Sequence, residues 1–158
     1  MKIKFKKLSE NAIVPVRGTL GAVGYDLFTV EDVQIVPKET IILKTGLSVE
    51  IPNEYEMQIR PRSGVSVKTD LVVMLGTIDS DYRGEIGVIV KNIGETVYAL
   101  EKGYRIAQAV INKCEIVEFE LVDELSETKR GSGGFGHTGT DLKSLVNEVL
   151  TNGEIGSN

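Results

Sequence analysis

The stretch VQIVPKETIILKTGLSVEIPNEYEMQI, residues 33–59, is the clearest indication of the fold class. It contains three β-like runs: Val33–Val36, Thr40–Ile51 and Tyr55–Ile59. Pro37 and the pair Pro52-Asn53 separate these runs, and proline and asparagine both favour turns. The stretch therefore predicts short strands that are joined by turns.

The same pattern continues on both sides of this stretch. Near the N-terminus, Ile3 and Phe5 alternate with lysines, as in a half-buried strand. Five more β-like runs follow: Leu71–Leu75, Ile86–Lys91, Val97–Leu100, Arg105–Lys113 and Glu115–Leu121. We find no helical period before residue 140. Many short strands at this spacing predict an all-β fold, either a sandwich or a barrel.

The chain changes character towards its C-terminus. Residues 131–140, GSGGFGHTGT, contain five glycines, and such a segment costs too much backbone entropy to pack into a core. The apolar residues of 141–150 recur at the i, i+3, i+4, i+7 and i+8 positions of an amphipathic helix. We therefore expect a β domain over residues 1–128, a flexible glycine-rich arm over 129–140 and a short helical extension over 141–158.

Composition limits the classes of function. The chain has 158 residues, of which 41% are hydrophobic, and a net charge of -5 at pH 7, which suits one compact soluble domain. The negative charge argues against general binding to nucleic acids or anionic membranes. No apolar run approaches the ~20 residues of a membrane-spanning helix, and the start MKIKFKK lacks a hydrophobic signal segment. We therefore expect no membrane association and a cytoplasmic location.

The content of cysteine and histidine restricts metal chemistry. Cys114 is the single cysteine, so an internal disulfide is excluded, and its apolar surroundings in the sequence predict a buried, inert thiol. One cysteine and one histidine cannot build a His/Cys metal cage. Any metal ion must therefore be a hard cation that oxygen atoms bind.

The glycine-rich stretch offers backbone N–H groups, the aromatic ring of Phe135 and the preceding cation Arg130. These groups suit a flexible arm that closes over a polyanion and covers a flat ring. The glycine spacing also matches a dinucleotide-binding fingerprint and a Walker A loop. No βαβ unit fits the residues that follow, however, and His137 stands where a Walker loop needs lysine. A disordered linker is the remaining alternative, against which Phe135 and Arg130 argue.

Four further segments interrupt the strand pattern with polar residues: Gly24–Leu27, Arg60–Gly64, Gly76–Glu85 and Arg105–Gln108. Asp26 lies between apolar positions, so it is either a solvated edge residue or a functional carboxylate. Arg62 presents a planar fork of donors that suits phosphate oxygens, although a turn with two solvated arginines fits equally well.

The segment GTIDSDYRGE, residues 76–85, holds three acids, an arginine and a tyrosine. It is either a hairpin tip with satisfied turns or the site of a water-activating carboxylate. In the last segment, strand alternation predicts Arg105 and Ala107 on one face and Ile106 and Gln108 on the other.

Together, these segments resemble the trimeric deoxyuridine triphosphatase (dUTPase) family in order and in spacing. The matching segments are Gly24–Leu27, Pro61–Gly64, Gly76–Glu85, Arg105–Gln108 and Arg130–Gly136. The resemblance implies a jelly-roll-like distorted β-barrel and a homotrimer with active sites that the subunits share. The implied reaction is hydrolysis of dUTP to dUMP and pyrophosphate, with Mg2+ on the triphosphate.

The resemblance also implies roles near the nucleoside and the reacting phosphorus. Asp79 would orient and deprotonate the water that attacks the α-phosphorus, since a carboxylate is ionised at neutral pH. Tyr82 would stack under the deoxyribose and exclude ribonucleotides. The backbone around Thr77 and Ile78 would face uracil.

Further roles concern the phosphates and the metal ion. The implied phosphate-binding residues are Arg62, Ser63, Gly64 and Gln108. Asp26 would hold Mg2+ through the ion's own waters. From the arm, Arg130 would reach the γ-phosphate and Phe135 would cover the uracil, with Gly136 beside it. Three positions depart from the family's pattern: Val73, Gly87 and His137.

Two other functions compete with this prediction. The related dCTP deaminases are the nearest enzymes, but the continuous segment 78–84 and the full glycine-rich arm favour a dUTPase. A nucleotide-binding or regulatory module is the alternative outside enzymes, and the intact Asp79 argues against it. The helical extension leaves room for a protein partner in addition to catalysis.

Overall fold

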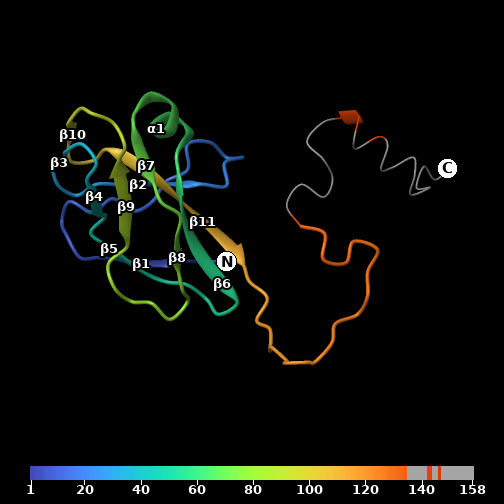
Figure 1. Cartoon of the computed structure of the whole chain (residues 1–158). Helices are drawn as coiled ribbons and strands as arrows, with labels where there is room; N and C mark the ends of the chain where they lie inside the picture. Colours follow the sequence, from blue (N-terminus) through green and yellow to red (C-terminus); the bar gives the residue numbers. More distant parts are fainter. Residues whose placement is uncertain (135–141, 144–145, 147–158) are drawn as a thin grey trace. The chain divides into compact units, whose positions relative to one another are not determined.

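The computed structural model describes residues 1–134, 142, 143 and 146 (Figure 1). The chain divides into two compact units, Met1–Val117 and Glu118–Asn158. The arm residues Phe135, Gly136 and His137 and most of the expected C-terminal helix lie outside the described residues. The expected boundaries at residues 128 and 140 stay a prediction.

Short strands dominate the first unit, as the sequence predicts. The strands are β1 (Lys4–Lys7), β2 (Tyr25–Phe28), β3 (Val33–Ile35), β4 (Thr40–Lys44), β5 (Leu47–Glu50), β6 (Tyr55–Pro61), β7 (Leu71–Val73), β8 (Gly76–Ile78), β9 (Gly87–Asn92), β10 (Tyr98–Leu100) and β11 (Arg105–Lys113), and the helix is α1 (Ser63–Lys68). The all-β class is therefore confirmed.

Two larger sheets and two ribbons organise these strands. The first sheet has the order β2-β11-β6-β8, and the second has the order β4-β9-β7. The ribbons pair β1 with β5 and β3 with β10. All pairs among these strands are antiparallel. The long strands β6 and β11 lie side by side in Figure 1, and their register pairs Arg60 with Gln108.

Both larger sheets contribute to one apolar core. Leu27, Ile59 and Ala109 of the first sheet belong to the same buried cluster as Leu43 and Val88 of the second sheet. Because successive side chains of a strand point to opposite faces, burying these residues turns their strand neighbours to the other face. That other face of the first sheet carries the polar residues of the candidate site.

Gly46 divides the expected run Thr40–Ile51 into β4 and β5. Its φ of 65° lies in the left-handed region, which glycine adopts without strain. A Cβ atom at this position would also lie only 2.8 Å from Val30 Cγ1. The apolar pattern of the sequence carries no sign of this break other than the glycine itself.

Three elements were not predicted: the helix α1 and the strands β2 and β8. The strand β2 covers most of Gly24–Leu27, which was expected to interrupt the strand pattern. The helix α1 corrects the expectation that no helix precedes residue 140. It is six residues long and buries only Val65, so it has no repeated apolar stripe. The strand β8 lies at the start of segment 76–85, which was expected to interrupt the strand pattern.

The prediction of a strand over Glu115–Leu121 is wrong, because these residues adopt no regular structure. A strand needs a neighbouring strand for its hydrogen bonds, and none of the described strands pairs with this segment. Phe119 and Leu121 are accordingly 96% and 100% exposed.

Cys114 was expected to be buried but is only partly so, since it follows the end of β11.

Candidate active site

Asp26 is the centre of a charged cluster on the first sheet. It lies on β2 next to the fully buried Leu27 and is itself buried. Asp26 Oδ1 lies 2.7 Å from Arg62 Nε, and Asp26 Oδ2 lies 3.4 Å from Arg105 Nη1. Burying a carboxylate is costly unless charged donors pair with it, and two guanidinium groups do so here. The alternative of a solvated edge residue is therefore excluded for Asp26.

A β-bulge in β11 brings Arg105 to this cluster. Arg105 pairs with Phe28 and Ala107 pairs with Leu27, so Ile106 is the extra residue on β11. Both Ile106 and Ala107 are fully buried as a result. The bulge corrects the predicted faces, because it puts Arg105 on the same face as Gln108 rather than on the opposite one.

Gln108 lies beside this cluster, opposite Asp26 in the register of β2 and β11. Its Nε2 donates a hydrogen bond of 2.8 Å to the Pro61 carbonyl oxygen. A Cβ atom at Gly24 would lie 1.9 Å from Gln108 Oε1. Glycine at position 24 therefore leaves the space that the anchored amide of Gln108 occupies.

Ser63 and Gly64 begin α1, directly after Arg62. The backbone N–H groups of Val65 and Ser66 donate to the Arg62 carbonyl oxygen, which starts the helix. Ser63 and Gly64 are both exposed, and no atom lies within 4 Å of a Cβ built on Gly64. A ligand thus has access to the backbone at this turn, next to the cluster around Asp26.

Asp79 and Tyr82 lie together in the loop that follows β8. The Tyr82 backbone N–H donates to the Asp79 carbonyl oxygen at 3.2 Å, and the Tyr82 hydroxyl donates to the Glu85 carbonyl oxygen at 3.0 Å. Asp79 is exposed, and among the described residues no hydrogen bond or ion pair occupies its carboxylate. This carboxylate is therefore available to water, as a general base must be.

The remaining polar groups of this loop support its shape. Glu85 Oε1 accepts a hydrogen bond of 2.7 Å from the Gly46 backbone N–H. Arg83 Nη1 donates to the carbonyl oxygens of Ser80 and Tyr82. A Cβ atom at Gly84 would lie 2.3 Å from the Tyr82 hydroxyl oxygen, so the ring packs over this glycine. Glu85 is thus a structural acid of the loop.

Thr77 and Ile78 lie on β8, at the edge of the first sheet. They pair with Gln58 and Met57 of β6. Thr77 is exposed and Ile78 is partly buried against the core. Because β8 has no further neighbour among the described strands, its other backbone edge can bind a flat polar ring.

The two groups of candidate residues lie far apart within one chain. Ile78 pairs with Met57 of β6, so the next residue, Asp79, lies beside Glu56. Asp26 pairs with Gln108, which pairs with Arg60, four residues further along β6. Three strand spacings of about 4.8 Å and four residues of about 3.3 Å put them roughly 20 Å apart. One chain therefore does not bring Asp79 to the cluster around Asp26.

The candidate arm belongs to the second unit. Arg130 Nε donates a hydrogen bond of 2.8 Å to the Gly133 carbonyl oxygen. Gly131 has a φ of 50°, and its backbone N–H donates to Thr128 Oγ1 at 3.1 Å. These bonds form a local turn at the start of the glycine-rich stretch.

Comparison with known proteins identifies the family. A family model described as dUTPase matches residues 10–139. The chain belongs to the dUTPase family. It is 50% identical over 141 residues to the deoxyuridine 5'-triphosphate nucleotidohydrolase of Nautilia profundicola, a match that covers 88% of this chain and 99% of the relative. Identity to the corresponding protein of Wolinella succinogenes is 46%, with 88% and 95% covered.

Solved structures agree with this assignment. A variant of the dUTPase of Staphylococcus bacteriophage 80alpha with dUpNHpp superposes with a TM-score of 0.85 at 35% identity, covering 88% of this chain and 99% of that one. A variant of the phage phi11 dUTPase, with a TM-score of 0.76 at 31% identity over 78% and 98% of the two chains, reveals the coordination of a structural Mg(II) ion. The jelly-roll-like all-β fold expected for the dUTPase family is thus present, and the chain is an enzyme of that family.

Two departures from the dUTPase pattern have structural explanations. Val73 lies on β7 and is buried in the core, so it presents no side chain to a ligand. Gly87 begins β9, and a Cβ atom there would lie 2.6 Å from Ile42 Cγ2 on the neighbouring strand β4. Packing therefore accounts for both residues.

The donors near Asp26 limit how Mg2+ could bind. Among the described residues, no three His, Cys, Asp or Glu side chains come together as a metal site. Both oxygens of Asp26 already face arginines. Asp26 is therefore not placed to bind a metal ion directly, and Mg2+ would take its ligands from substrate phosphates and its own waters.

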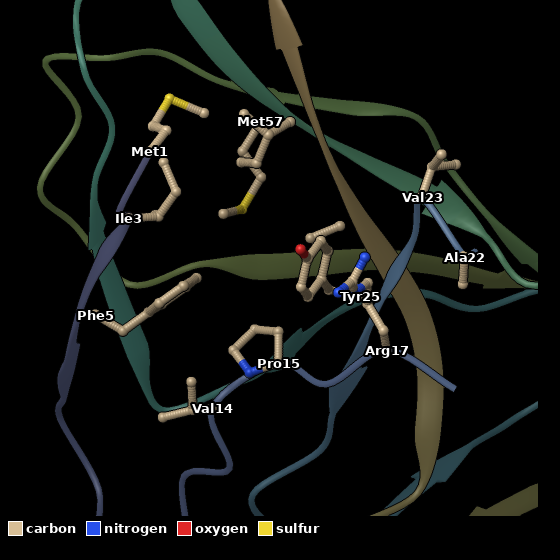
Figure 2. Close-up of a pocket in the computed structure, with 12 residues that line it drawn as sticks. Met1, Ile3, Phe5, Val14, Pro15, Arg17, Ala22, Val23, Tyr25 and Met57 are labelled. Atoms are coloured by element: carbon tan, nitrogen blue, oxygen red, sulfur yellow. The ribbon is translucent and has the colours of Figure 1, made fainter. Parts of the chain in front are cut away.

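A pocket of about 490 Å³ lies on the core-facing side of the first sheet (Figure 2). Its lining is apolar apart from Arg17 and the hydroxyl group of Tyr25, and the Arg17 guanidinium carbon lies 5.5 Å from the centre of the Tyr25 ring. Met1, Phe5 and Met57 line other parts of its wall. The pocket contains none of the candidate dUTPase residues, and its chemistry does not suit a triphosphate.

Across the described residues, no helix is long and apolar enough to span a membrane.

Cys114 lies near the Asp79 end of the first sheet. Partial burial raises the pKa of its thiol, and the negative charges of Glu56 and Asp79 raise this pKa further. The thiolate is therefore disfavoured at neutral pH. Cys114 is unsuited to act as a nucleophile, in agreement with the inert thiol expected from the sequence.

Proposed function

We propose that this enzyme hydrolyses dUTP to dUMP and pyrophosphate by attack of water on the α-phosphorus. The observation that carries the proposal is the exposed carboxylate of Asp79, which pairs with none of the described residues and lies in a loop that Tyr82 holds in shape. Membership of the dUTPase family and the binding of the dUTP analogue dUpNHpp by the phage 80alpha relative support it. Lowering dUTP and supplying dUMP for thymidylate synthesis is the corresponding biological role.

Asp79 acts as the general base in this proposal. It orients the attacking water and accepts its proton, while pyrophosphate leaves with the electron pair of the broken bond. The ring of Tyr82, held against Gly84, stacks under the deoxyribose and fills the space of a 2′-hydroxyl. The edge of β8 at Thr77 and Ile78 binds uracil, because backbone donors and acceptors distinguish it from cytosine.

The phosphates bind at the other group of residues. Arg62 and the exposed turn at Ser63 and Gly64 contact phosphate oxygens, and Gln108 helps to position them. Mg2+ bound to the triphosphate would neutralise developing charge, and Asp26 would hold it through the ion's waters. From the arm, Arg130 reaches the γ-phosphate while Phe135, with Gly136, covers the uracil.

The separation of the two groups of residues supports a site that is shared between subunits. A general base must lie within hydrogen-bond reach of its water, yet Asp79 and the cluster around Asp26 are roughly 20 Å apart in one chain. A head-to-tail ring of three copies would bring the Asp79 end of one copy to the Arg62 end of the next. The glycine-rich arm would then close over the shared site. The cytoplasmic location and a partner for residues 141–158 stay predictions.

One set of kinetic measurements tests the reaction and the base. Pyrophosphate release from dUTP, dTTP, dCTP and UTP should show a strong preference for dUTP. Asp79→Asn should lower kcat by about a hundredfold or more, because general-base catalysis is lost, while dUpNHpp still binds.

Asp81→Asn is the matched control, since Asp81 is an exposed acid two residues away with no assigned role. Equal losses in both variants would contradict the assignment of the base to Asp79. Release of ammonia from dCTP would instead favour a deaminase, and equal turnover of dTTP would contradict the proposed uracil specificity.

A further inference from the structure

Arg105 is the charged residue of the cluster to which the proposed reaction assigns no role. Its Nη1 lies 3.4 Å from Asp26 Oδ2, whereas Arg62 contacts the other carboxylate oxygen, Oδ1. We propose that Arg105 is a second phosphate-binding arginine, which acts beside Arg62 on the triphosphate. This inference rests on the proposed function, since the triphosphate is its ligand.

The bulge in β11 supplies the first argument. A regular strand would turn Arg105 to the face opposite Gln108, which is the core face of this sheet. Ile106 is the extra residue, and it reverses the alternation so that Arg105 joins Asp26 and Gln108. A bulge disrupts the ladder of backbone hydrogen bonds, and this one re-aims a charged side chain towards the candidate phosphate site.

The two arginines are held differently. Arg62 makes a short contact with Asp26, donates a second bond to the Arg105 carbonyl oxygen and has a side chain only 26% exposed. The Arg105 side chain is 57% exposed, and its contact with Asp26 is the longer one. A guanidinium group has five N–H donors, so Arg105 retains donors that face solvent on the same side as Asp26.

The charges of the cluster supply the third argument. One carboxylate, Asp26, balances one of the two guanidinium groups, so the cluster keeps one excess positive charge. The chain as a whole carries a net charge of -5, so this excess is local and does not reflect a basic surface. A triphosphate can accept a forked pair of hydrogen bonds from each arginine, with Asp26 holding both side chains in position before the nucleotide arrives.

Calorimetric titration of Arg105→Gln with dUpNHpp and with dUMP tests this role. The variant should bind dUpNHpp on the order of tenfold to a hundredfold more weakly, because charge-assisted hydrogen bonds to phosphate are lost. Binding of dUMP should change much less, since dUMP lacks the β- and γ-phosphates. Arg17→Gln is the matched control, because Arg17 lies against Tyr25 at the apolar pocket and should leave both affinities unchanged.

A purely structural role for Arg105 predicts another result. If Arg105 only neutralised Asp26, Arg105→Gln would lower the melting temperature while the ratio of dUpNHpp to dUMP affinity stayed at the wild-type value. That result would overturn the inference. Should Arg105→Gln fail to fold, Arg105→Lys decides: loss of the planar fork should weaken dUpNHpp binding alone, and wild-type affinity would contradict the role. A wild-type protein that neither binds dUpNHpp nor hydrolyses dUTP would contradict the proposed function instead.

Discussion

At the scale of single residues, the contact between Tyr82 and Gly84 is open to a direct test. A Cβ atom at position 84 would lie 2.3 Å from the Tyr82 hydroxyl oxygen and 2.5 Å from Cζ, so Gly84→Ala must displace the ring. Because the ring is proposed to exclude a 2′-hydroxyl, the preference for dUTP over UTP should fall by about tenfold. The values of kcat/KM for both nucleotides measure this preference.

Gly21→Ala is the control for this substitution, since no atom lies within 4 Å of a Cβ built on Gly21. It should leave the ratio of the two kcat/KM values unchanged. If Gly84→Ala retains the wild-type preference for dUTP over UTP, the ring of Tyr82 does not set this specificity.

Single residues also show what a sequence can and cannot predict about the site. Asp79, Tyr82 and Arg62 were identified as candidates because their chemistry is unusual at turns between apolar strands. The position of Arg105 was not found, because Arg-Ile-Ala-Gln alternates as a regular strand does, and the bulge depends on how β11 pairs with β2. Local pattern thus identifies candidate side chains for the site, whereas strand pairing decides which of them meet.

At the scale of elements, the buried Asn92 fixes the end of β9. Its Nδ2 donates to the carbonyl oxygens of Ile35 and Thr96, at 3.1 and 2.8 Å, and its Oδ1 accepts from the Gly94 backbone N–H. Asn92→Ala leaves these groups without a partner, so the free energy of unfolding should fall by about 2–4 kcal/mol. Urea denaturation measures this loss, and the activity of the folded fraction should persist.

Asn53→Ala serves as the control, because Asn53 is exposed in the turn between β5 and β6. Its urea midpoint should remain close to that of the wild type. Equal midpoints for the two variants would contradict the stabilising role of Asn92.

The elements differ in how well sequence predicts them. The strand β11 was predicted with both ends correct, because its nine residues of β-like pattern begin shortly after the turn signal Lys102-Gly103. The segment Glu115–Leu121 has an equally good pattern but no strand beside it. The helix α1 has too few residues to show a helical period. Pattern alone therefore predicts the capacity to form a strand, and the available partners decide whether one forms.

At the scale of the whole molecule, the roughly 20 Å between Asp79 and the cluster around Asp26 predicts complementation between inactive variants. Asp79→Asn and Arg62→Gln should each be nearly inactive alone. When the two are co-expressed or refolded together, some shared sites combine the intact Asp79 of one copy with the intact Arg62 of another. Random mixing in a ring should restore about a quarter of the sites.

The control mixture pairs Asp79→Asn with Tyr82→Ala. Both residues lie in the loop after β8 of the same chain, so every loop in the mixed assembly carries one of the two defects. This mixture should show no recovery beyond the average of its components. Recovery only in the mixture with Arg62→Gln would mean that the two ends of the first sheet act in different copies. Failure of both mixtures, with mixed assemblies verified by two affinity tags, would mean that each chain completes its own site by a rearrangement of the loop after β8.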